Sequence, residues 1–327
     1  MQVQAKQVLI VSPATARENN GNWQTASRWA AFLRTRHQVA IGASWVVGDR
    51  TPDLLIALHA RRSAAAIANF ARAYPSRPRV VVLTGTDLYR DIEASSEARD
   101  SLAYATSLVL LQGDGVANLP PALRPKARVI YQSAPSVPPV AHGRPGRYCE
   151  ITMIGHLRAE KDPLTFMRAS ALVTSPKARL VHIGGALDAS LGLAASATQA
   201  GGTQAGGTRY CWLGNQPHAV TRRRLARSHA MAICSQMEGG ANVIIEAVTS
   251  GVPVLASDIS GNRGMLGDDY AGYFPVGNAV ALAALIDRSI ADSAFHARLV
   301  AQCAARAVLF APERERASLL DLVDNLG

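Results

Sequence analysis

The sequence alternates short apolar runs with stretches of helical spacing, and it does so twice. In the first half the apolar runs read QVLIVS, QVAIGAS, DLLIALH, RVVVLTG, SLVLLQ and ARVIYQS, and helical spacing covers Asn22–Arg36 and Arg61–Ala73. Strands that are apolar almost throughout are covered on both faces of a sheet, and helices between them make neighbouring strands parallel. The first half therefore predicts an open α/β domain.

A segment rich in proline and glycine separates the two halves. Ser133–Tyr148 reads SAPSVPPVAHGRPGRY and has no hydrophobic periodicity, as is typical of a linker. The alternation then restarts with CEITMIGHL, ARLVHIGG, RYCWLGN, HAMAICSQ and VPVLASD. A chain of 327 residues has room for two domains. We expect an N-terminal domain over 1–135, a linker over 136–148 and a C-terminal domain over 149–311.

The remaining segments of the second half are less regular. Ala186–Thr208 consists of small residues and contains the near-duplicate TQAGGTQAGGT, which predicts a loop. Ala279–Leu326 is helical throughout with a break at Pro312. The break predicts a separate C-terminal helix over 312–327. Whether this helix packs against the N-terminal domain stays open. Three further helices are expected over Pro163–Val173, near His218–Arg227 and from Asn242.

The formal charge of +10 allows several kinds of partner. The basic run TRRRLARSH at Thr221–His229 has helical spacing and is read first as a solvated helix face, with a nucleic-acid-binding module as the alternative. Anionic small molecules explain the charge equally well. No apolar run is long enough for a membrane span, and we expect a cytoplasmic protein because no signal segment begins the sequence.

Two glutamates stand eight positions apart in EGGANVIIEAVTSGVPVLASD. Glu238 follows an expected strand and precedes an expected helix, and this is where open parallel sheets bind ligands. Glu246 lies further into that helix, where its carboxylate suits a pair of vicinal hydroxyls such as those of a ribose. The alternative is that both are surface residues of an ordinary strand–helix–strand unit.

This segment resembles the E-x7-E signature of retaining GT-B glycosyltransferases of family 4, in which two Rossmann-like domains face each other across a cleft. The resemblance implies an enzyme that binds a UDP-sugar donor, with Glu238 as a catalytic residue on the donor sugar and Glu246 on the ribose. By the same resemblance the diphosphate lies near the amides of Gly239, Gly240, Ala241 and Asn242.

A second segment, IGHLRAEKDPLTFMRAS, is similar to the strand, loop and helix that clamp the diphosphate in that family. The resemblance gives this catalytic role to Arg158 and Lys161. The chain has no D-x-D metal-binding pattern, so fixed cations must stabilise the leaving nucleoside diphosphate, and we expect no metal and no cofactor. The loop WLGNQP resembles the one near the base, which adds Gly214 and Asn215. A loosely placed surface arginine and lysine is the alternative.

The acceptor is then expected in the first domain. Gly21 and Asn22 precede a helix whose first amides suit an anion, although Asn22 could equally be an ordinary N-cap. His59 ends one strand and Thr84, Gly85 and Thr86 end another. A histidine at a strand end is more often structural than functional.

Thr86 departs from the family pattern. Many family members read T-x-H-D here, with the histidine at the reaction centre, and this chain reads LTGTD. The departure points to an acceptor that is already ionised and gives Thr86 a catalytic role. Across its length the chain most resembles the selenosugar synthases of selenoneine biosynthesis, which implies transfer from UDP-N-acetylglucosamine to selenophosphate with a carbon–selenium bond formed. Alternatives are a small alcohol or thiol acceptor and, remotely, a sugar-nucleotide 2-epimerase; the oligomeric state stays open.

Overall fold

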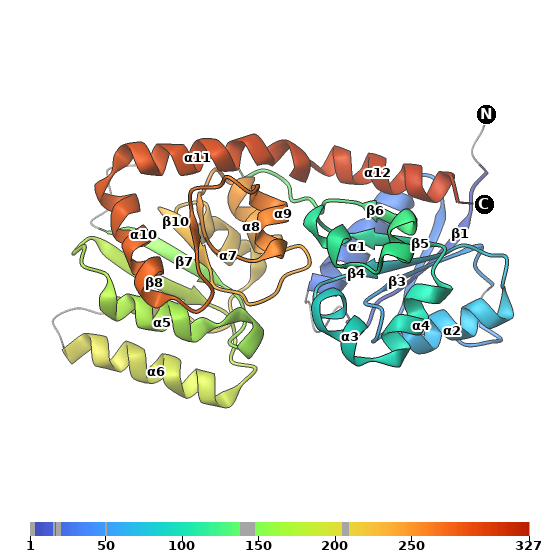
Figure 1. Ribbon diagram of the computed structural model, residues 1–327, viewed down its shortest axis with the longest axis horizontal. Helices are drawn as coiled ribbons and strands as arrows, with labels where there is room; N and C mark the ends of the chain where they lie inside the picture. The colour runs from blue at the N-terminus through green and yellow to red at the C-terminus, as the bar shows by residue number, and fades with distance from the viewer. Residues whose placement is uncertain are drawn as a thin grey trace. The chain divides into compact units, whose positions relative to one another are not determined.

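The computed structural model describes residues 4–15, 17, 21–49, 51–137, 148–204 and 209–326. The chain divides into two compact units (Figure 1). Unit 1 comprises Met1–Ser133, Glu238–Gly240 and Leu309–Gly327, and unit 2 comprises Ala134–Met237 and Ala241–Val308. Residues 138–147, most of the expected linker, lie outside the described residues.

Unit 1 is built on a parallel sheet of six strands in the order β2-β1-β3-β4-β5-β6. The apolar runs of the first half form these strands, which confirms the predicted parallel sheet. β3 is buried at every residue because helices cover both faces. The strands are β1 (Gln7–Val11), β2 (Gln38–Gly42), β3 (Leu54–Leu58), β4 (Arg79–Leu83), β5 (Ser107–Leu110) and β6 (Ala127–Val129).

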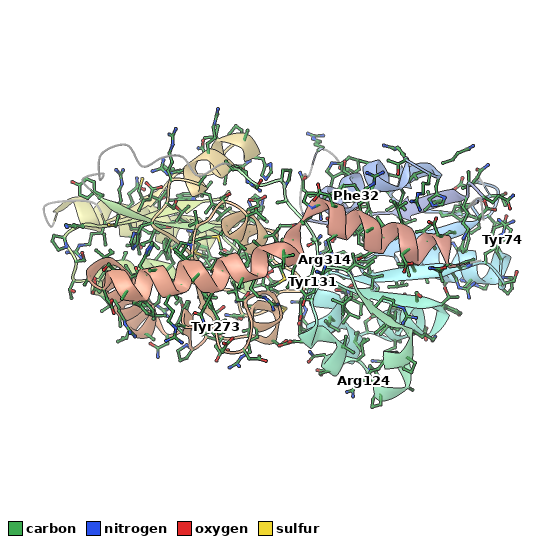
Figure 2. The ribbon with its side chains drawn as sticks, turned by 90° about the horizontal axis from the view of Figure 1, so that it is seen from above. Phe32, Tyr74, Arg124, Tyr131, Tyr273 and Arg314 are labelled. Carbon is green, nitrogen blue, oxygen red and sulfur yellow. The ribbon has the colours of Figure 1, made fainter. Side chains whose placement is uncertain are left out.

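Helices cover this sheet with their apolar sides. Trp29 and Leu33 of α1 are fully buried against one face, and Phe32, labelled in Figure 2, packs at the margin of the same cluster. The other face is covered by a second cluster, in which Trp45 packs edge-on to Phe70. The helical elements are α1 (Gly21–Leu33), α2 (Ala64–Ala73), η1 (Asp87–Asp91), α3 (Ile92–Ala94), α4 (Ser96–Tyr104), η2 (Asp114–Asn118) and η3 (Pro121–Lys126).

The C-terminal helix α12 (Pro312–Asp324) belongs to unit 1 and packs against α1 (Figure 1). Leu319 and Val323 bury fully in the α1 side of the core. The carboxylate of Glu315, 1% exposed, accepts hydrogen bonds from Arg28, from the indole N–H of Trp29 at 2.7 Å and from the amide of Ser133 at 2.8 Å.

Unit 2 repeats the architecture with a parallel sheet in the order β12-β11-β10-β7-β8-β9. Its strands are β7 (Cys149–Ile154), β8 (Ala178–Ile183), β9 (Tyr210–Trp212), β10 (Ala230–Ile233), β11 (Val254–Ser257) and β12 (Tyr273–Phe274). The helical elements are η4 (Ala159–Lys161), α5 (Pro163–Leu172), α6 (Ala189–Gln204), α7 (His218–Leu225), α8 (Asn242–Val248), α9 (Ser260–Leu266), α10 (Ala279–Ala291), α11 (Ser293–Ala307) and η5 (Val308–Phe310).

The loop expected over Ala186–Thr208 is wrong for most of its length. Residues Ala189–Gln204 form α6, which lies beside α5 and also packs against β9 (Figure 1). Alanine has the highest helix propensity, and the glycines near the end of α6 were too few to stop the helix. Residues 205–208 lie outside the described residues.

The predicted helical stretch Ala279–Leu326 has the expected break before Pro312 and a second break at Asp292. There the chain is extended, and the Asp292 carboxylate caps α11 by accepting from the amide of Phe295 at 2.9 Å. None of the helices in the described part of the chain has both the length and the hydrophobicity of a membrane-spanning segment.

Candidate active site

The residues predicted to bind the donor follow the strands of unit 2 at one edge of its sheet. β10 pairs in parallel with β7, and β7 with β8, so the loops after these strands emerge side by side. A backbone bond ties two of the loops together, since the amide of Gln236 after β10 donates to the carbonyl of Glu160 after β7 at 2.9 Å. The carboxyl edge of such a sheet is where ligands bind.

Glu246 lies in α8 with its side chain 12% exposed. Its Oε1 is 2.7 Å from Nε2 of His218 and 3.8 Å from a guanidinium nitrogen of Arg222. The hydrogen bond to Glu246 raises the pKa of His218 above its ordinary value, against the opposing effect of burial. This carboxylate is therefore fixed by α7, and two of its neighbours are basic.

Sequence reasoning missed His218. The residue is the first of α7 and directly follows the loop Trp212–Pro217 that was predicted to lie near the base. Its position there was the available signal, but nothing local in the sequence indicates a contact with a residue 28 positions further on.

The chain between β10 and α8 carries Glu238, Gly239 and Gly240, and Ala241 is the N-cap of α8. Glu238 is half-buried. Asn242 begins α8, where the sequence predicted a helix to begin, so Glu238 does lie in a strand-to-helix loop.

Arg158 and Lys161 lie in the loop after β7. Arg158 is exposed and its backbone is extended. Lys161 ends η4, and its aliphatic side chain lies over Gly155: a Cβ atom placed on Gly155 would be 3.7 Å from Cδ of Lys161. The next residue, Asp162, has a left-handed backbone (φ 43°) and caps α5, accepting from the amide and hydroxyl of Thr165. The turn therefore holds the two cations at the carboxyl edge of β7.

Gly214 and Asn215 follow β9 at the same edge. Gly214 has a left-handed backbone (φ 65°), which glycine adopts without strain, and its carbonyl accepts from the amide of Gly184 after β8 at 2.8 Å. Asn215 lies against Gly185: a Cβ atom placed on Gly185 would be 3.6 Å from Cβ of Asn215. The loops after β8 and β9 thus support each other.

In unit 1, β3 ends at Leu58, so His59 directly follows it, whereas Thr86 follows β4, and the two side chains meet. Nε2 of His59 is 3.0 Å from the Thr86 hydroxyl, and the imidazole is 3% exposed while Thr86 is half-buried. Carboxylate oxygens of Asp87 and Asp91 lie 3.9 Å from Nδ1 and 3.8 Å from Nε2 respectively. Burial lowers the pKa of His59, which outweighs the raising effect of the carboxylates.

Asp87 organises this strand end, and sequence reasoning missed it. Its buried carboxylate accepts backbone hydrogen bonds at 2.8–3.2 Å from Ala60, Thr84, Gly85 and Leu88. The amides of Thr84 and Gly85 are therefore directed at Asp87. Of the predicted strand-end residues, Thr86 is the one whose polar side chain is half-buried and bonded to His59.

Gly21 is exposed and begins α1, one residue earlier than predicted. Asn22 is therefore inside the helix, and the alternative that it is an N-cap is wrong. The hydroxyl of Thr25 donates back to the carbonyl of Gly21 at 2.8 Å, which fixes this first turn.

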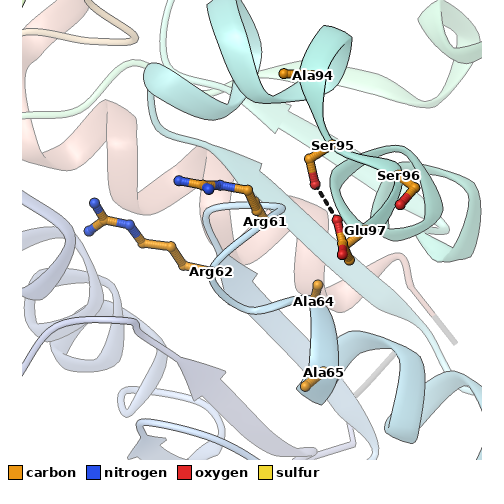
Figure 3. A pocket seen from close by; sticks show the side chains of 8 residues that line it. All are labelled: Arg61, Arg62, Ala64, Ala65, Ala94, Ser95, Ser96 and Glu97. Carbon is orange, nitrogen blue, oxygen red and sulfur yellow. Dashed lines mark hydrogen bonds between the residues drawn. The ribbon is translucent and has the colours of Figure 1, made fainter.

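An open pocket of about 750 Å³ lies in unit 1 beside the end of β3 (Figure 3). Arg61 and Arg62 extend to the same side of it, away from the link between α3 and α4, where the Ser95 hydroxyl bonds Glu97 at 2.6 Å. Arg61 also pairs with Asp91 at 2.9 Å. Within the described ranges no three histidine, cysteine, aspartate or glutamate side chains gather as metal ligands would.

Several solved structures share the fold of this chain over nearly its whole length but have little sequence in common with it. HepE of Anabaena, solved in complex with UDP-glucose, is 16% identical and superposes with a TM-score of 0.76, covering 98% of this chain and 100% of that one. Sucrose-phosphate synthase of Thermosynechococcus elongatus is 17% identical (TM-score 0.77), and a glycosyltransferase of Rickettsia africae is 14% identical (TM-score 0.76), each covering 98% of both chains. The GT-B fold predicted from the sequence is thereby confirmed.

No curated protein matches the chain in sequence. A family model does match: the one described as glycosyl transferases group 1 covers residues 139–306, more than half of the chain. The match includes both predicted donor motifs, the loop with Arg158 and Lys161 and the segment from Glu238 to Glu246. The chain therefore belongs to the group 1 glycosyltransferases.

Proposed function

We propose that this glycosyltransferase transfers a sugar from a UDP-sugar, N-acetylglucosamine being the first candidate, to selenophosphate. A selenium lone pair forms a bond to the anomeric carbon, the bond from that carbon to the β-phosphate oxygen breaks, and UDP leaves with the electron pair. Water then cleaves the phosphorus–selenium bond, releasing phosphate and leaving the selenosugar needed for selenoneine biosynthesis.

The donor side of the proposal is supported by Glu246. A carboxylate with two oxygens suits the two hydroxyls of a ribose, and this one is already held in a fixed position by His218. HepE, which has the same fold, was solved with UDP-glucose. We assign Glu246 to the ribose and Glu238 to the hydroxyls of the transferred sugar.

The leaving diphosphate needs positive charge. Arg158 and Lys161 carry that charge at the carboxyl edge of β7, and we assign them to the diphosphate together with the backbone amides of Gly239, Gly240, Ala241 and Asn242. Gly214 and Asn215, at the same edge, are assigned to the base. On this assignment, catalysis requires no metal ion.

One observation carries the acceptor assignment: Thr86 stands where the family pattern has a histidine, and the imidazole that it contacts is buried behind it. A threonine hydroxyl is not a base near neutral pH. Selenophosphate needs none, because it is anionic and nucleophilic already. We assign Thr86, with Thr84, Gly85 and His59, to one side of the acceptor site and Gly21 and Asn22 to its phosphoryl oxygens.

A second candidate acceptor, a small alcohol or thiol, is favoured if the hydrogen bond between His59 and Thr86 runs in the opposite direction. If His59 accepted a hydrogen bond from Thr86, the pair could relay a proton away from a hydroxyl. The two candidates therefore differ in which atom of the His59–Thr86 pair carries the shared hydrogen.

The test incubates the protein with UDP-N-acetylglucosamine or UDP-glucose and with selenophosphate, glycerol or a simple thiol, and follows products by mass spectrometry. The proposal expects UDP and a selenium-bearing sugar only where selenophosphate is present. Sugar transfer to glycerol or to the thiol, with none to selenophosphate, would establish the second candidate instead.

A further inference from the structure

The proposed acceptor site has a buried imidazole in contact with the Thr86 hydroxyl. We infer that His59 is a positioning residue, which donates its Nε2 hydrogen to the Thr86 hydroxyl oxygen and so leaves the hydroxyl hydrogen free for an anionic acceptor. The inference rests on the proposed function in one respect, namely that the acceptor lies at Thr86.

The bonding of the other ring nitrogen indicates the tautomer. The amide of Arg62 donates to Nδ1 of His59 at 3.4 Å, so Nδ1 carries a lone pair. A neutral imidazole with a lone pair on Nδ1 carries its hydrogen on Nε2. Two oxygens lie near Nε2, Thr86 Oγ1 at 3.0 Å and Asp91 Oδ2 at 3.8 Å, and only the threonine oxygen is within hydrogen-bond distance. The Nε2 hydrogen is therefore donated to Thr86 Oγ1.

The imidazole is neutral because of its surroundings. Burial disfavours the charged ring most, and the guanidinium groups of Arg61 and Arg62 act in the same direction, whereas Asp87 and Asp91 act against it. The net effect lowers the pKa of His59. At neutral pH the ring therefore has one hydrogen to donate and one lone pair, and both are used inside the protein.

The backbone of His59 is strained, and strained residues are concentrated at functional sites. Its φ of 72° lies in the left-handed region, which it shares with Asp162 alone among the non-glycine residues that the structure describes. Such a conformation persists where neighbouring contacts enforce it, and here the His59 amide donates to the Val82 carbonyl at 2.9 Å while its carbonyl accepts from Ser63 at 3.1 Å.

The acceptor class follows from this arrangement. With Thr86 Oγ1 accepting the Nε2 hydrogen, the hydroxyl hydrogen of this half-buried residue is available to an acceptor. The site can therefore donate a hydrogen bond to an oxyanion or to an anionic nucleophile, but it has no lone pair on His59 left to remove a proton from a hydroxyl. The structure thus favours an acceptor that arrives ionised.

The tautomer can be measured without any substrate. Nitrogen-15 NMR of the full-length protein labelled at histidine is expected to show for His59 a neutral ring with hydrogen on Nε2 at pH 7, assigned by comparison with His59→Gln. In Thr86→Val the Nε2 signal should shift, because its acceptor is gone. A ring protonated on Nδ1, or on both nitrogens, would overturn the inference whatever the enzyme transfers.

Kinetics supply the second test. His59→Asn tolerates the left-handed backbone but is too short to donate to Thr86, whereas the amide of His59→Gln can reach the Nε2 position. His59→Asn and Thr86→Val are each expected to lower kcat about tenfold, the double variant no further than either, and His59→Gln by less than about threefold. UDP affinity should not change in any of them.

Two outcomes contradict the inference. Additive losses in the double variant would mean that His59 and Thr86 act independently of each other. A His59→Gln variant as slow as His59→Asn would mean that the imidazole takes up a proton. Absence of transfer to selenophosphate by the wild-type protein would refute the proposed function, and the NMR result would still stand or fall by itself.

Discussion

Nε2 of His218 lies 2.7 Å from Oε1 of Glu246, which joins the first residue of α7 to the middle of α8. The contact fixes the carboxylate that we assign to the donor ribose. The contact also gives Glu246 a titratable neighbour. The His218 side chain is 56% exposed, so it can exchange its proton with solvent. Donor binding and pH should therefore be linked through this pair.

The first prediction concerns Glu246 itself. Glu246→Gln keeps the shape of the side chain but loses the charge-assisted hydrogen bonds to the ribose, so UDP should bind more weakly by roughly 1–3 kcal/mol. Isothermal titration calorimetry measures the affinity, and the thermal melting curve serves as the control for folding. Equal UDP affinity in the variant would remove Glu246 from the ribose site.

The second prediction is a pH dependence of stability. The hydrogen bond to Glu246 raises the folded-state pKa of His218 above 6.5, so the protonated pair stabilises the folded state below about pH 6.5 and loses this effect as pH rises through the raised pKa. Because His218 is largely exposed, the effect should be about 0.2–1 kcal/mol.

Urea denaturation of wild type and His218→Ala at about pH 5.5 and about pH 8.5 checks this sign, with the difference between them larger at the lower pH. A difference that grew with pH would show that His218 is held neutral and that the pairing with Glu246 is not ionic.

The third prediction concerns the diphosphate. Arg158→Ala should cost about 2–4 kcal/mol of transition-state stabilisation, seen as a fall in kcat/KM, because a fixed cation at the leaving group is lost. Arg168→Ala is the matched control, since Arg168 is an exposed arginine on the following helix α5. EDTA should leave turnover unchanged. Strict dependence on magnesium would contradict the assignment of Arg158 and Lys161 as the counter-charges.

The fourth prediction concerns the anchor of α12. Glu315→Gln places an amide N–H among the donors of Arg28, Trp29 and Ser133 and removes the negative charge that the Arg28 guanidinium contacts, so we expect a loss of about 3–5 kcal/mol in the free energy of unfolding. Glu313→Gln, two residues earlier and exposed, should change it by less than about 0.5 kcal/mol. Similar midpoints of urea denaturation for the two variants would show that the buried carboxylate is not needed.

The elements that the sequence predicted well are those determined by local patterns. The apolar run LLIAL must be covered on both faces, and it became the fully buried strand β3. Pro163 after Asp162 marked a helix start, and α5 begins there. The segment around α6 was misread because its glycines and its repeat resemble a loop, whereas its alanines and the packing against α5 and β9 make it a helix.

The site was predictable only in part, for a physical reason. Glu246, Arg158 and Lys161 belong to motifs that are contiguous in the chain. The partners that orient site residues come from elsewhere: His218 meets Glu246 across 28 positions, and His59 meets Thr86 across 27. Such pairs are created by the crossover connections of a parallel sheet, which bring distant strand ends together, and no local pattern encodes them.

The last prediction tests where the acceptor binds. Gly21 is the exposed first residue of α1, and we assign it to the phosphoryl oxygens of selenophosphate. A valine side chain there should displace the anion, and a shift of about 1 Å can reduce the rate about 10²-fold. Gly21→Val should therefore lose selenosugar formation while keeping wild-type UDP affinity. Gly201→Val, an exposed glycine of α6 with open space around it, is the control and should keep both. If Gly21→Val turns over at the wild-type rate, the acceptor does not lie at the start of α1, and the assignment of Gly21 and Asn22 fails.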